Sequence, residues 1–436
     1  MRGDGDIAPE DAEQPGQGSG IERAGLYWSF ASFAIVGSAG LALNLIVEHA
    51  FGREALGRFN VLLAVFLIGG QAGSLGIQSA VLYHAPRASA FGQPVASVLR
   101  AGLKVNAVGS TFCAVAVVGA GALLFSTTGN VEYRDGLFAM FVGLALYPLN
   151  KTLLAFVNGL RQIRLYSTVF AGRYVVLITL VGLIAATGGS PSSLPWAISL
   201  TEVVLFALLC LINQRHLRSR SSDGDAPALG RVLLGFGVRG LAGGLLLDLN
   251  TRVDILILGA LTGSSAVGRY SIASMFAEGI YQLALVSRSS LDPAVAHLYL
   301  RSEETELRRL FRTGRLRVYA LIAPVGVMSM LLYLPVVGAL FDSTVARETL
   351  WIYVILAGGV CLSAGFIPFT SVLQQTGEPG RQSLLLALVS GTNIVMNLAL
   401  VPMLGVYGSA LGTGIAQVAL VFYIRTMSRC HLGYSV

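Results

Sequence analysis

Charged side chains are scarce in this chain of 436 residues. Asp, Glu, Lys and Arg make up only 12% of it, whereas 54% of the residues are hydrophobic and the mean hydropathy is +0.70. A soluble globular protein has roughly a quarter of its residues charged, so this chain has too few polar side chains to cover a water-exposed surface. The composition excludes an ordinary soluble enzyme and indicates a protein embedded in a membrane.

Cysteine and lysine are also rare. The four cysteines are scattered along the chain, at Cys113, Cys210, Cys361 and Cys430. Their spacing suggests neither a disulfide framework nor a set of metal ligands, and we expect no metal site and no bound cofactor. Only two lysines are present, so the net charge of +7 comes almost wholly from arginine.

The first 23 residues differ from the rest of the chain. They contain six acidic residues and two arginines, without the basic segment and apolar core that open a secretory signal peptide. Such a polar segment cannot bury enough apolar surface to fold alone. We predict a disordered cytoplasmic tail over residues 1–23.

Twelve apolar runs follow, each about as long as the 20 residues that a membrane-spanning helix needs. Helices are expected because lipid offers the backbone no water to bond with. The sequence therefore predicts an all-α membrane protein with a first bundle at 24–213, a linker at 214–228, a second bundle at 229–430 and a short cytoplasmic C-terminus at 431–436. The twelve runs cover residues 24–50, 57–83, 97–125, 136–158, 166–187, 195–213, 230–261, 266–297, 316–341, 348–374, 382–402 and 407–427.

Basic residues are distributed unequally between the two sides of these helices. Twenty fall on the side of the termini, and only five fall on the other, namely Arg53, Arg58, Arg134, Arg269 and Arg347. Because short cytoplasmic loops are enriched in Lys and Arg, we predict that both termini are cytoplasmic. The external loops are too short for a catalytic domain, so a membrane-bound polymerase or glycosyltransferase is a weaker interpretation and no catalytic residue is expected.

A short motif occurs in both halves of the chain. Ala55-Leu-Gly-Arg-Phe59 opens the second run, and Ala266-Val-Gly-Arg-Tyr270 opens the eighth, 211 residues later. With six helices in each half, both halves start on the cytoplasmic side, so the two bundles would be related by a pseudo-two-fold axis along the membrane normal. Secondary transporters are commonly built from such repeats, with the substrate between the halves near the midplane.

Several segments resemble a known family. The segments are Gly52-Arg-Glu-Ala-Leu-Gly-Arg-Phe-Asn60, Gly76-Ile-Gln-Ser-Ala80, Arg252-Val-Asp-Ile-Leu-Ile-Leu-Gly259, Val267-Gly-Arg-Tyr-Ser-Ile-Ala273, Asn393-Ile-Val-Met-Asn-Leu-Ala-Leu-Val-Pro402 and Gly405-Val-Tyr-Gly-Ser-Ala410. In order and spacing they resemble the bacterial polysaccharide and O-antigen flippases, which share a superfamily with the multidrug and toxin extrusion proteins.

That resemblance implies two six-helix bundles around a central cavity. It also implies that an undecaprenyl-diphosphate-linked oligosaccharide is moved from the inner to the outer leaflet of the bacterial cytoplasmic membrane. The implied partners are this lipid-linked glycan and membrane lipid, with contacts to a polysaccharide polymerase or glycosyltransferases and no nucleic acid. A cation-coupled drug exporter of the sibling family is the alternative. Lipid II flippases of the superfamily carry two further helices that this chain lacks.

Five cations lie inside predicted spans. Burying each in hydrocarbon costs about 2.5–3.5 kcal/mol or more, which calls for a reason. Four of them fall at a similar depth from the cytoplasmic side and could form a basic ring that binds a diphosphate through charge-assisted hydrogen bonds. The five candidate substrate-binding residues are Lys151, Arg173, Arg239, Arg252 and Arg288. The alternative for each is an ion pair, a bond to a helix-end carbonyl, or a side chain extended to the interface.

Acidic residues also lie inside the predicted spans. Asp248 and Arg252 are four residues apart, the spacing of an ion pair on one helix face. Glu48, Asp254 and Glu278 are candidates to bind a coupling proton or sodium ion, with pairing to an arginine as the alternative for each. Amides and aromatic residues in the spans, Gln71, Asn106, Tyr174, Asn393 and Asn397 among them, could line a sugar-binding cavity or join helices.

Overall fold

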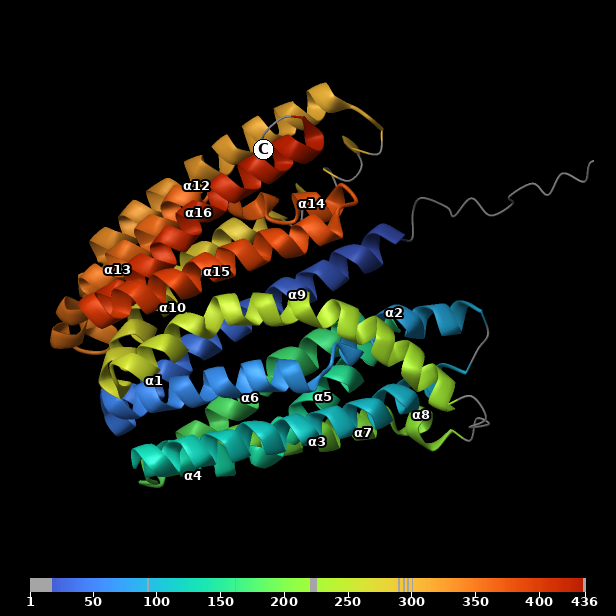
Figure 1. Ribbon diagram of the computed structural model, residues 1–436, viewed down its shortest axis with the longest axis horizontal. Helices are drawn as coiled ribbons and strands as arrows, with labels where there is room; N and C mark the ends of the chain where they lie inside the picture. The colour runs from blue at the N-terminus through green and yellow to red at the C-terminus, as the bar shows by residue number, and fades with distance from the viewer. Residues whose placement is uncertain are drawn as a thin grey trace, which may run out of the picture.

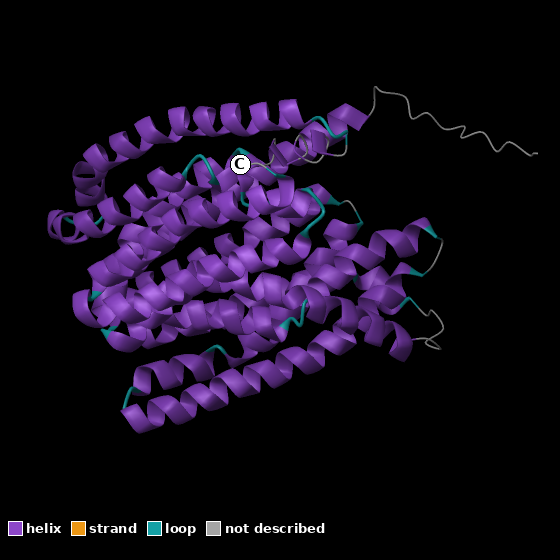
Figure 2. Ribbon diagram, turned by 45° about the horizontal axis from the view of Figure 1, so that its top comes forward, coloured by secondary structure: helices purple, strands orange, loops and turns teal. Residues whose placement is uncertain are grey.

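The computed structural model describes residues 18–91, 94–160, 162–219, 226–288, 291–292, 295, 298–299 and 301–433. Within these ranges the chain consists of helices joined by short turns, and no strand is present (Figure 2). The predicted disordered tail lies largely outside the described residues, and the first helix begins at Gly18.

The first half of the chain forms two long helices and several shorter ones. α1 (Gly18–Gly73) consists of two arms that meet at Gly52, where φ is 84° and ψ is 170°. This left-handed backbone favours glycine, and it reverses the chain between the first and second predicted spans. The remaining elements are α2 (Ile77–Ala90), α3 (Val95–Thr128), α4 (Val131–Ala139), α5 (Phe141–Gly159), α6 (Ile163–Ala186), η1 (Pro191–Ser193), α7 (Leu194–Ile212) and α8 (Gln214–Arg218).

The second half repeats this pattern of long helices. Its elements are α9 (Ala226–Leu261), α10 (Ser264–Val286), α12 (Glu304–Leu340), α13 (Ser343–Ser363), η3 (Ile367–Phe369), α14 (Val372–Gln375), α15 (Pro379–Leu404) and α16 (Val406–Leu432).

Twelve spans follow from these elements, as predicted. Nine of the described helices are long and apolar enough to cross a membrane. One of the nine, α1, contains two spans because its arms run in opposite directions, and α9 and α10 supply the remaining two. The second arm of α1 and α2 form a single span that is interrupted at residues 74–76, where Leu75 and Gly76 have positive φ.

Many large apolar side chains face outward, which is expected of a protein whose solvent is lipid. On α3, Phe112 is 76% exposed and Leu123 is 72% exposed. On α16, Phe422 is 67% exposed. An apolar surface of this extent would cause a soluble protein to aggregate, so the chain is a multi-pass membrane protein.

The helices form two groups (Figure 1). α2 to α8 lie in the lower group of that view and α10 to α16 in the upper group, with α1 and α9 between them. α9 contacts both groups: the backbones of Gly237 and Gly76 touch, and the carbonyl of Leu246 accepts a hydrogen bond from Ser390 of α15 at 3.2 Å. The predicted bundle limits at 213 and 229 stay predictions.

Candidate functional site

A buried ion pair lies in the core of the first bundle. Arg173 on α6 donates to the carboxylate of Glu202 on α7 at 3.2 Å, and the two side chains are only 12% and 3% exposed. Asn150 on α5 donates to the same carboxylate at 2.8 Å and to the Glu202 backbone carbonyl at 2.9 Å. These contacts tie α5, α6 and α7 together and hold the Arg173 guanidinium in one orientation.

A second cation joins this pair through an aromatic ring. The Arg173 guanidinium lies 4.7 Å from the centre of the Tyr147 ring, and the Lys151 ammonium lies 5.3 Å from it. Lys151 also donates to the side-chain oxygen of Gln71 on the second arm of α1. Lys151 and Arg173 therefore both lie beside the Tyr147 ring, and with the Glu202 carboxylate they form a group of two cations and one anion.

A third candidate cation approaches from the other half of the chain. Arg252 on α9 is close enough to Tyr174 on α6 to interact with it electrostatically, and Tyr174 interacts likewise with Arg173 and Tyr147. The structure thus brings Lys151, Arg173 and Arg252 toward one pair of tyrosines where α9 meets the first bundle. We call these three cations and two tyrosines the basic cluster. The side chain of Asp248, the predicted partner of Arg252, lies outside the described residues.

The other two candidate cations are bonded within their own helical segments. Arg239 is exposed and donates to the carbonyl of Gly235 at 2.9 Å. Arg288 donates to Asp292 at 3.1 Å, and the other oxygen of Asp292 accepts from Ser371 at 2.6 Å. These contacts do not place either side chain against the basic cluster, so the four-membered basic ring stays a prediction.

Asp254 lies in a polar network of the second bundle. It is 7% exposed, accepts a hydrogen bond from the hydroxyl of Tyr270 on α10, and accepts another from the Ile255 amide at 2.9 Å. The Tyr270 hydroxyl also lies 3.2 Å from that of Thr413 on α16. Asp254 therefore bonds to a tyrosine of its own half and to the adjacent backbone, and it also interacts electrostatically with Arg252 on its own helix.

Asparagines extend this network along α15. Asn397 donates to the side-chain oxygen of Asn393 at 2.7 Å and accepts from Ser409 at 2.8 Å. In the first bundle, Asn106 donates to the Pro148 carbonyl at 2.9 Å. These amides join helices or adjacent turns, which is the second of the two roles expected for them.

The two remaining candidate acids differ in their surroundings. Glu48 is 12% exposed and lies 3.7 Å from His49. Glu278 is exposed on α10, and it forms no hydrogen bond or ion pair with the part of the chain that the structure describes. Within that same part, no group of three or more His, Cys, Asp or Glu side chains is arranged to hold a metal ion.

Sequence reasoning missed three residues that organise these sites. The Tyr147 ring lies beside both Lys151 and Arg173. Asn150 donates to the Glu202 carboxylate, and Tyr270 donates to Asp254. Asn150 stood next to a charged residue in an apolar helix, which is a signal that it bonds between helices. Tyrosines in a membrane protein are more often interfacial, so nothing in the sequence singled out Tyr147, and the repeated motif contained Tyr270 without indicating that it bonds an acid.

The two halves of the chain contact each other at one end of the molecule, which we call the Gly52 end after the bend in α1. An ion pair there joins Arg53 on α1 to Glu348 on α13. The hydroxyl of Tyr133 on α4 lies 3.3 Å from that of Ser264 on α10. Both contacts cross from the first half to the second.

The repeated motif forms the centre of this contact. A Cβ atom at Gly57 would overlap the backbone carbonyl of Ser264 and would lie 3.0 Å from the amide nitrogen of Gly268. A Cβ atom at Gly268 would overlap the carbonyl of Arg53. The glycines of the two motif copies thus allow α1 and α10 to touch through their backbones, and they close the Gly52 end.

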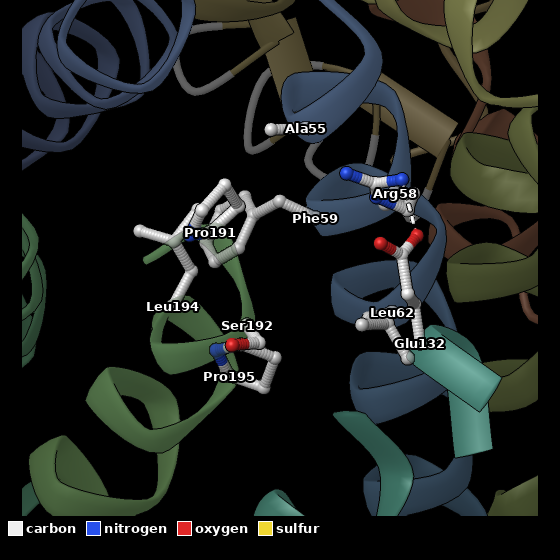
Figure 3. Close-up of a pocket in the computed structure, with 9 residues that line it drawn as sticks. All are labelled: Ala55, Arg58, Phe59, Leu62, Glu132, Pro191, Ser192, Leu194 and Pro195. Atoms are coloured by element: carbon white, nitrogen blue, oxygen red, sulfur yellow. Dashed lines mark hydrogen bonds and ion pairs between the residues drawn. The ribbon is translucent and has the colours of Figure 1, made fainter. Parts of the chain in front are cut away.

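Arg58, which follows Gly57 in the motif, forms ion pairs at the same end. Arg58 pairs with Glu132 on α4 and, at 3.1 Å, with Glu54 on its own helix. Figure 3 shows Arg58 and Glu132 on one side of a small pocket, with Pro191 and Leu194 of the η1–α7 segment opposite. The pocket adjoins the closed end and contains none of the candidate substrate-binding residues.

Known structures share this fold. An inward-facing multidrug resistance MATE family transporter of the MOP superfamily matches with a TM-score of 0.75 and 14% identity, over 91% of this chain and 94% of its own. The lipid II flippase MurJ, in an inward closed conformation, matches with a TM-score of 0.71 and 15% identity, over 93% and 87% of the two chains. A MOP superfamily transporter from Pyrococcus furiosus matches with a TM-score of 0.63 and 15% identity, over 95% of each chain.

These likenesses establish the fold, since their identities are too low to show more. Among curated proteins, none matches the sequence. A family model described as polysaccharide biosynthesis protein matches residues 103–345, which is more than half of the chain. The chain therefore belongs to this family of polysaccharide biosynthesis proteins, and it has the two-bundle fold of the MOP superfamily.

Proposed function

We propose that the protein is a flippase that moves an undecaprenyl-diphosphate-linked oligosaccharide from the cytoplasmic to the outer leaflet of the bacterial inner membrane. The family supports a role in making a polysaccharide, such as an O-antigen or exopolysaccharide. The fold is one that both a lipid II flippase and multidrug transporters use. A membrane protein of this family with such a fold fits the transport step of polysaccharide assembly better than a catalytic step.

The basic cluster is the observation that carries the proposal. A diphosphate brings about two to three negative charges into a low-dielectric environment, and it needs charge-assisted donors to compensate for lost hydration. Lys151 and Arg173 offer two cations against the one carboxylate of Glu202, and Arg252, which also interacts electrostatically with Asp254, approaches them from α9. The diphosphate would bind here, and the exposed Arg239 with Arg288 would attract it on the way in.

The closed Gly52 end supports a direction for this step. In the orientation predicted from the arginine distribution, the Gly52 end faces outward and both termini are cytoplasmic. A molecule closed at its outer end is poised to receive substrate from the cytoplasmic leaflet. Rocking of the two bundles would then separate Gly57 from Ser264 and release the glycan on the outer side, which is alternating access.

The orientation can be measured directly. A membrane-impermeant thiol reagent added to intact cells should label a Ser343→Cys variant at the Gly52 end and should not label Ser219→Cys. The opposite pattern would invert the proposed direction of transport.

A cation-coupled multidrug exporter is the second candidate. The buried acids Glu202 and Asp254 favour it, because such exporters use carboxylates to bind protons or sodium. Both acids are already bonded, to Arg173 and to Tyr270, so neither carboxylate stands ready for a cationic substrate. For this reason the flippase is the better-supported function.

Complementation of surface-glycan export in a flippase-deficient strain tests the proposal. The Arg239→Ala, Arg288→Ala double variant should lose export while immunoblots show normal amounts of protein. The proposal gives these two cations the role of attracting the diphosphate on its way in, and the double variant removes both charges. Arg308 and Arg309, changed to alanine in the same way, serve as the matched control, because they remove the same charge where each arginine pairs with an acid of its own helix, Glu304 and Glu306. Wild-type export by the double variant would refute a role for these two cations.

A further inference from the structure

Three aromatic rings lie in a row along α6. Tyr166, Phe170 and Tyr174 follow one another at intervals of four residues, which places them on one face of the helix. The centres of the first two rings are 5.9 Å apart, and those of the second and third are 6.1 Å apart. We call these three residues the aromatic row.

The aromatic row faces away from lipid. The outward side of α6 carries Thr168, Val175 and Leu183, which are all exposed. At about 100° of rotation per residue, this outward side lies opposite the row. Tyr174, at one end of the row, is close enough to Arg252 on α9 to interact with it electrostatically. The row therefore faces the second half of the chain.

Accessibility changes along this interior face of α6. Leu177 and Val181 continue the face toward the Gly52 end, and they are only 7% and 0% exposed. That direction is fixed by η1, which follows α6 and lies beside Arg58 and Glu132 at the Gly52 end. The three rings of the row, in contrast, are only half-buried. The row is thus an aromatic surface that is accessible within the molecule, on the side opposite the closed end.

The charges around the row indicate what kind of ligand it suits. Arg173 is close enough to both Tyr166 and Tyr174 to interact with them electrostatically. Lys151 and Arg252 of the basic cluster add positive charge at the same end, which disfavours a cationic ligand. Sugar rings present apolar C–H groups that stack on the partly negative faces of aromatic rings, and tyrosine hydroxyls can bond to sugar hydroxyls. Sugars joined to a diphosphate would fit the row and the basic cluster together.

We propose that the aromatic row binds the sugars next to the diphosphate of the lipid-linked glycan by stacking on them. This inference rests on the proposed flippase function, and it assigns glycan binding to Tyr166 and Phe170, which lie outside the basic cluster. At a rise of about 1.5 Å per residue, the row extends about 12 Å from Tyr174 toward the end opposite Gly52. Before transport, the glycan would lie along this length on the cytoplasmic side of the diphosphate. The protein should therefore distinguish a glycosylated lipid from the bare lipid diphosphate.

Binding of two lipids to the purified full chain in nanodiscs tests this site. The probes are undecaprenyl diphosphate and the same lipid carrying the glycan that accumulates in cells lacking the protein, and bound lipid is counted by native mass spectrometry. With each ring contributing roughly five- to tenfold to the affinity, the Tyr166→Leu, Phe170→Leu variant should bind the glycosylated lipid about 25- to 100-fold more weakly. Its affinity for the bare lipid should stay near that of the wild type, because the basic cations are untouched.

Two control variants separate stacking from other effects. Tyr166→Phe keeps the ring and should bind both lipids as the wild type does. The Phe112→Leu, Phe422→Leu variant removes two rings from the outward surface, where they are 76% and 67% exposed, and it should also leave both affinities unchanged.

Four outcomes would overturn the proposal. Equal weakening for both lipids would mean that the rings act only through the basic cluster, and equal loss in Tyr166→Phe and Tyr166→Leu would assign binding to the hydroxyl instead of the ring. Equal affinity of the wild type for the two lipids would remove glycan binding from the row and leave the proposed flippase function standing. Binding of neither lipid by folded wild-type protein would overturn both. If the double variant is not monodisperse on gel filtration, Tyr166→Leu alone carries the test, with a loss of about five- to tenfold expected.

Discussion

Replacing Gly57 by alanine should open the Gly52 end. The new Cβ would overlap the backbone carbonyl oxygen of Ser264 and would approach the Gly268 amide nitrogen to 3.0 Å. A backbone atom cannot rotate away as the tip of a flexible side chain can. The clash is therefore relieved only by separating α1 from α10, which is the motion that alternating access requires.

The size of the effect follows from the cost of overpacking. Inserting a methyl group into a well-packed contact costs about 1–3 kcal/mol. If that cost falls only on the closed arrangement, it shifts the equilibrium toward an open Gly52 end by about 5- to 150-fold. An open state that is rare in the wild type would become readily detectable.

Distances between spin labels measure this shift. We would label Val131→Cys on α4 and Ser265→Cys on α10, after replacing the four native cysteines by alanine, and record the distance distribution in nanodiscs. Gly57→Ala should add a longer-distance population. Gly182→Ala is the matched control, because its Cβ would have no atom within 4 Å. A Gly57→Ala distribution identical to that of the wild type, in folded protein, would refute the closure assigned to the repeated motif.

Three further predictions concern individual contacts. Arg53→Glu should also populate the open state in the spin-label assay, and adding Glu348→Arg should reverse this by restoring the pair; failure of the swap would mean that the pair does not hold the end closed. Glu202→Ala should lower the free energy of unfolding by about 3–5 kcal/mol, because it leaves a buried guanidinium without its carboxylate. Its melting temperature on fluorescence-detected gel filtration should fall far more than that of the exposed control Glu306→Ala, and similar melting temperatures would contradict this. Tyr270→Phe should lower the free energy of unfolding by about 1–3 kcal/mol, because it removes the donor to a buried carboxylate. An unchanged melting temperature in the same assay would show that the hydrogen bond contributes little.

The helices could be predicted from the sequence because lipid imposes a simple rule. Every backbone polar group in the bilayer must be bonded within its own segment, so each long apolar run becomes a helix. The run predicted at 166–187 shows how closely this holds, since the helix there spans Ile163–Ala186. The break at 74–76 was not predicted, because Leu75 adopts a positive φ that its residue type does not favour.

The candidate site was only partly predictable. Residue counting gives the depth of a charge along its helix, but it does not give the direction in which the side chain points. Lys151 and Arg173 were expected at a similar depth, and the structure places both on the Tyr147 ring. Arg239 was expected at the same depth, yet its side chain donates to a carbonyl of its own helix. Such differences depend on how helices rotate and pack, which apolar periodicity does not determine.

The contact made by the repeated motif was also not predictable from the sequence. Its recurrence after 211 residues was visible in the sequence and suggested two related halves. The sequence did not reveal that Gly57 and Gly268 face each other's helices across the boundary between those halves. That contact requires the fold, because it joins residues from the second and eighth spans.

The most direct test of the central claim is transport by the purified protein in liposomes. Undecaprenyl-diphosphate-linked oligosaccharide with a labelled glycan is placed in the membrane, and its appearance in the opposite leaflet is followed with an enzyme or lectin that cannot cross. The account predicts protein-dependent translocation that falls sharply in the Lys151→Ala, Arg252→Ala variant, which leaves the Arg173–Glu202 pair intact. Absence of translocation by folded wild-type protein, together with ion-driven uptake of a cationic drug, would contradict it.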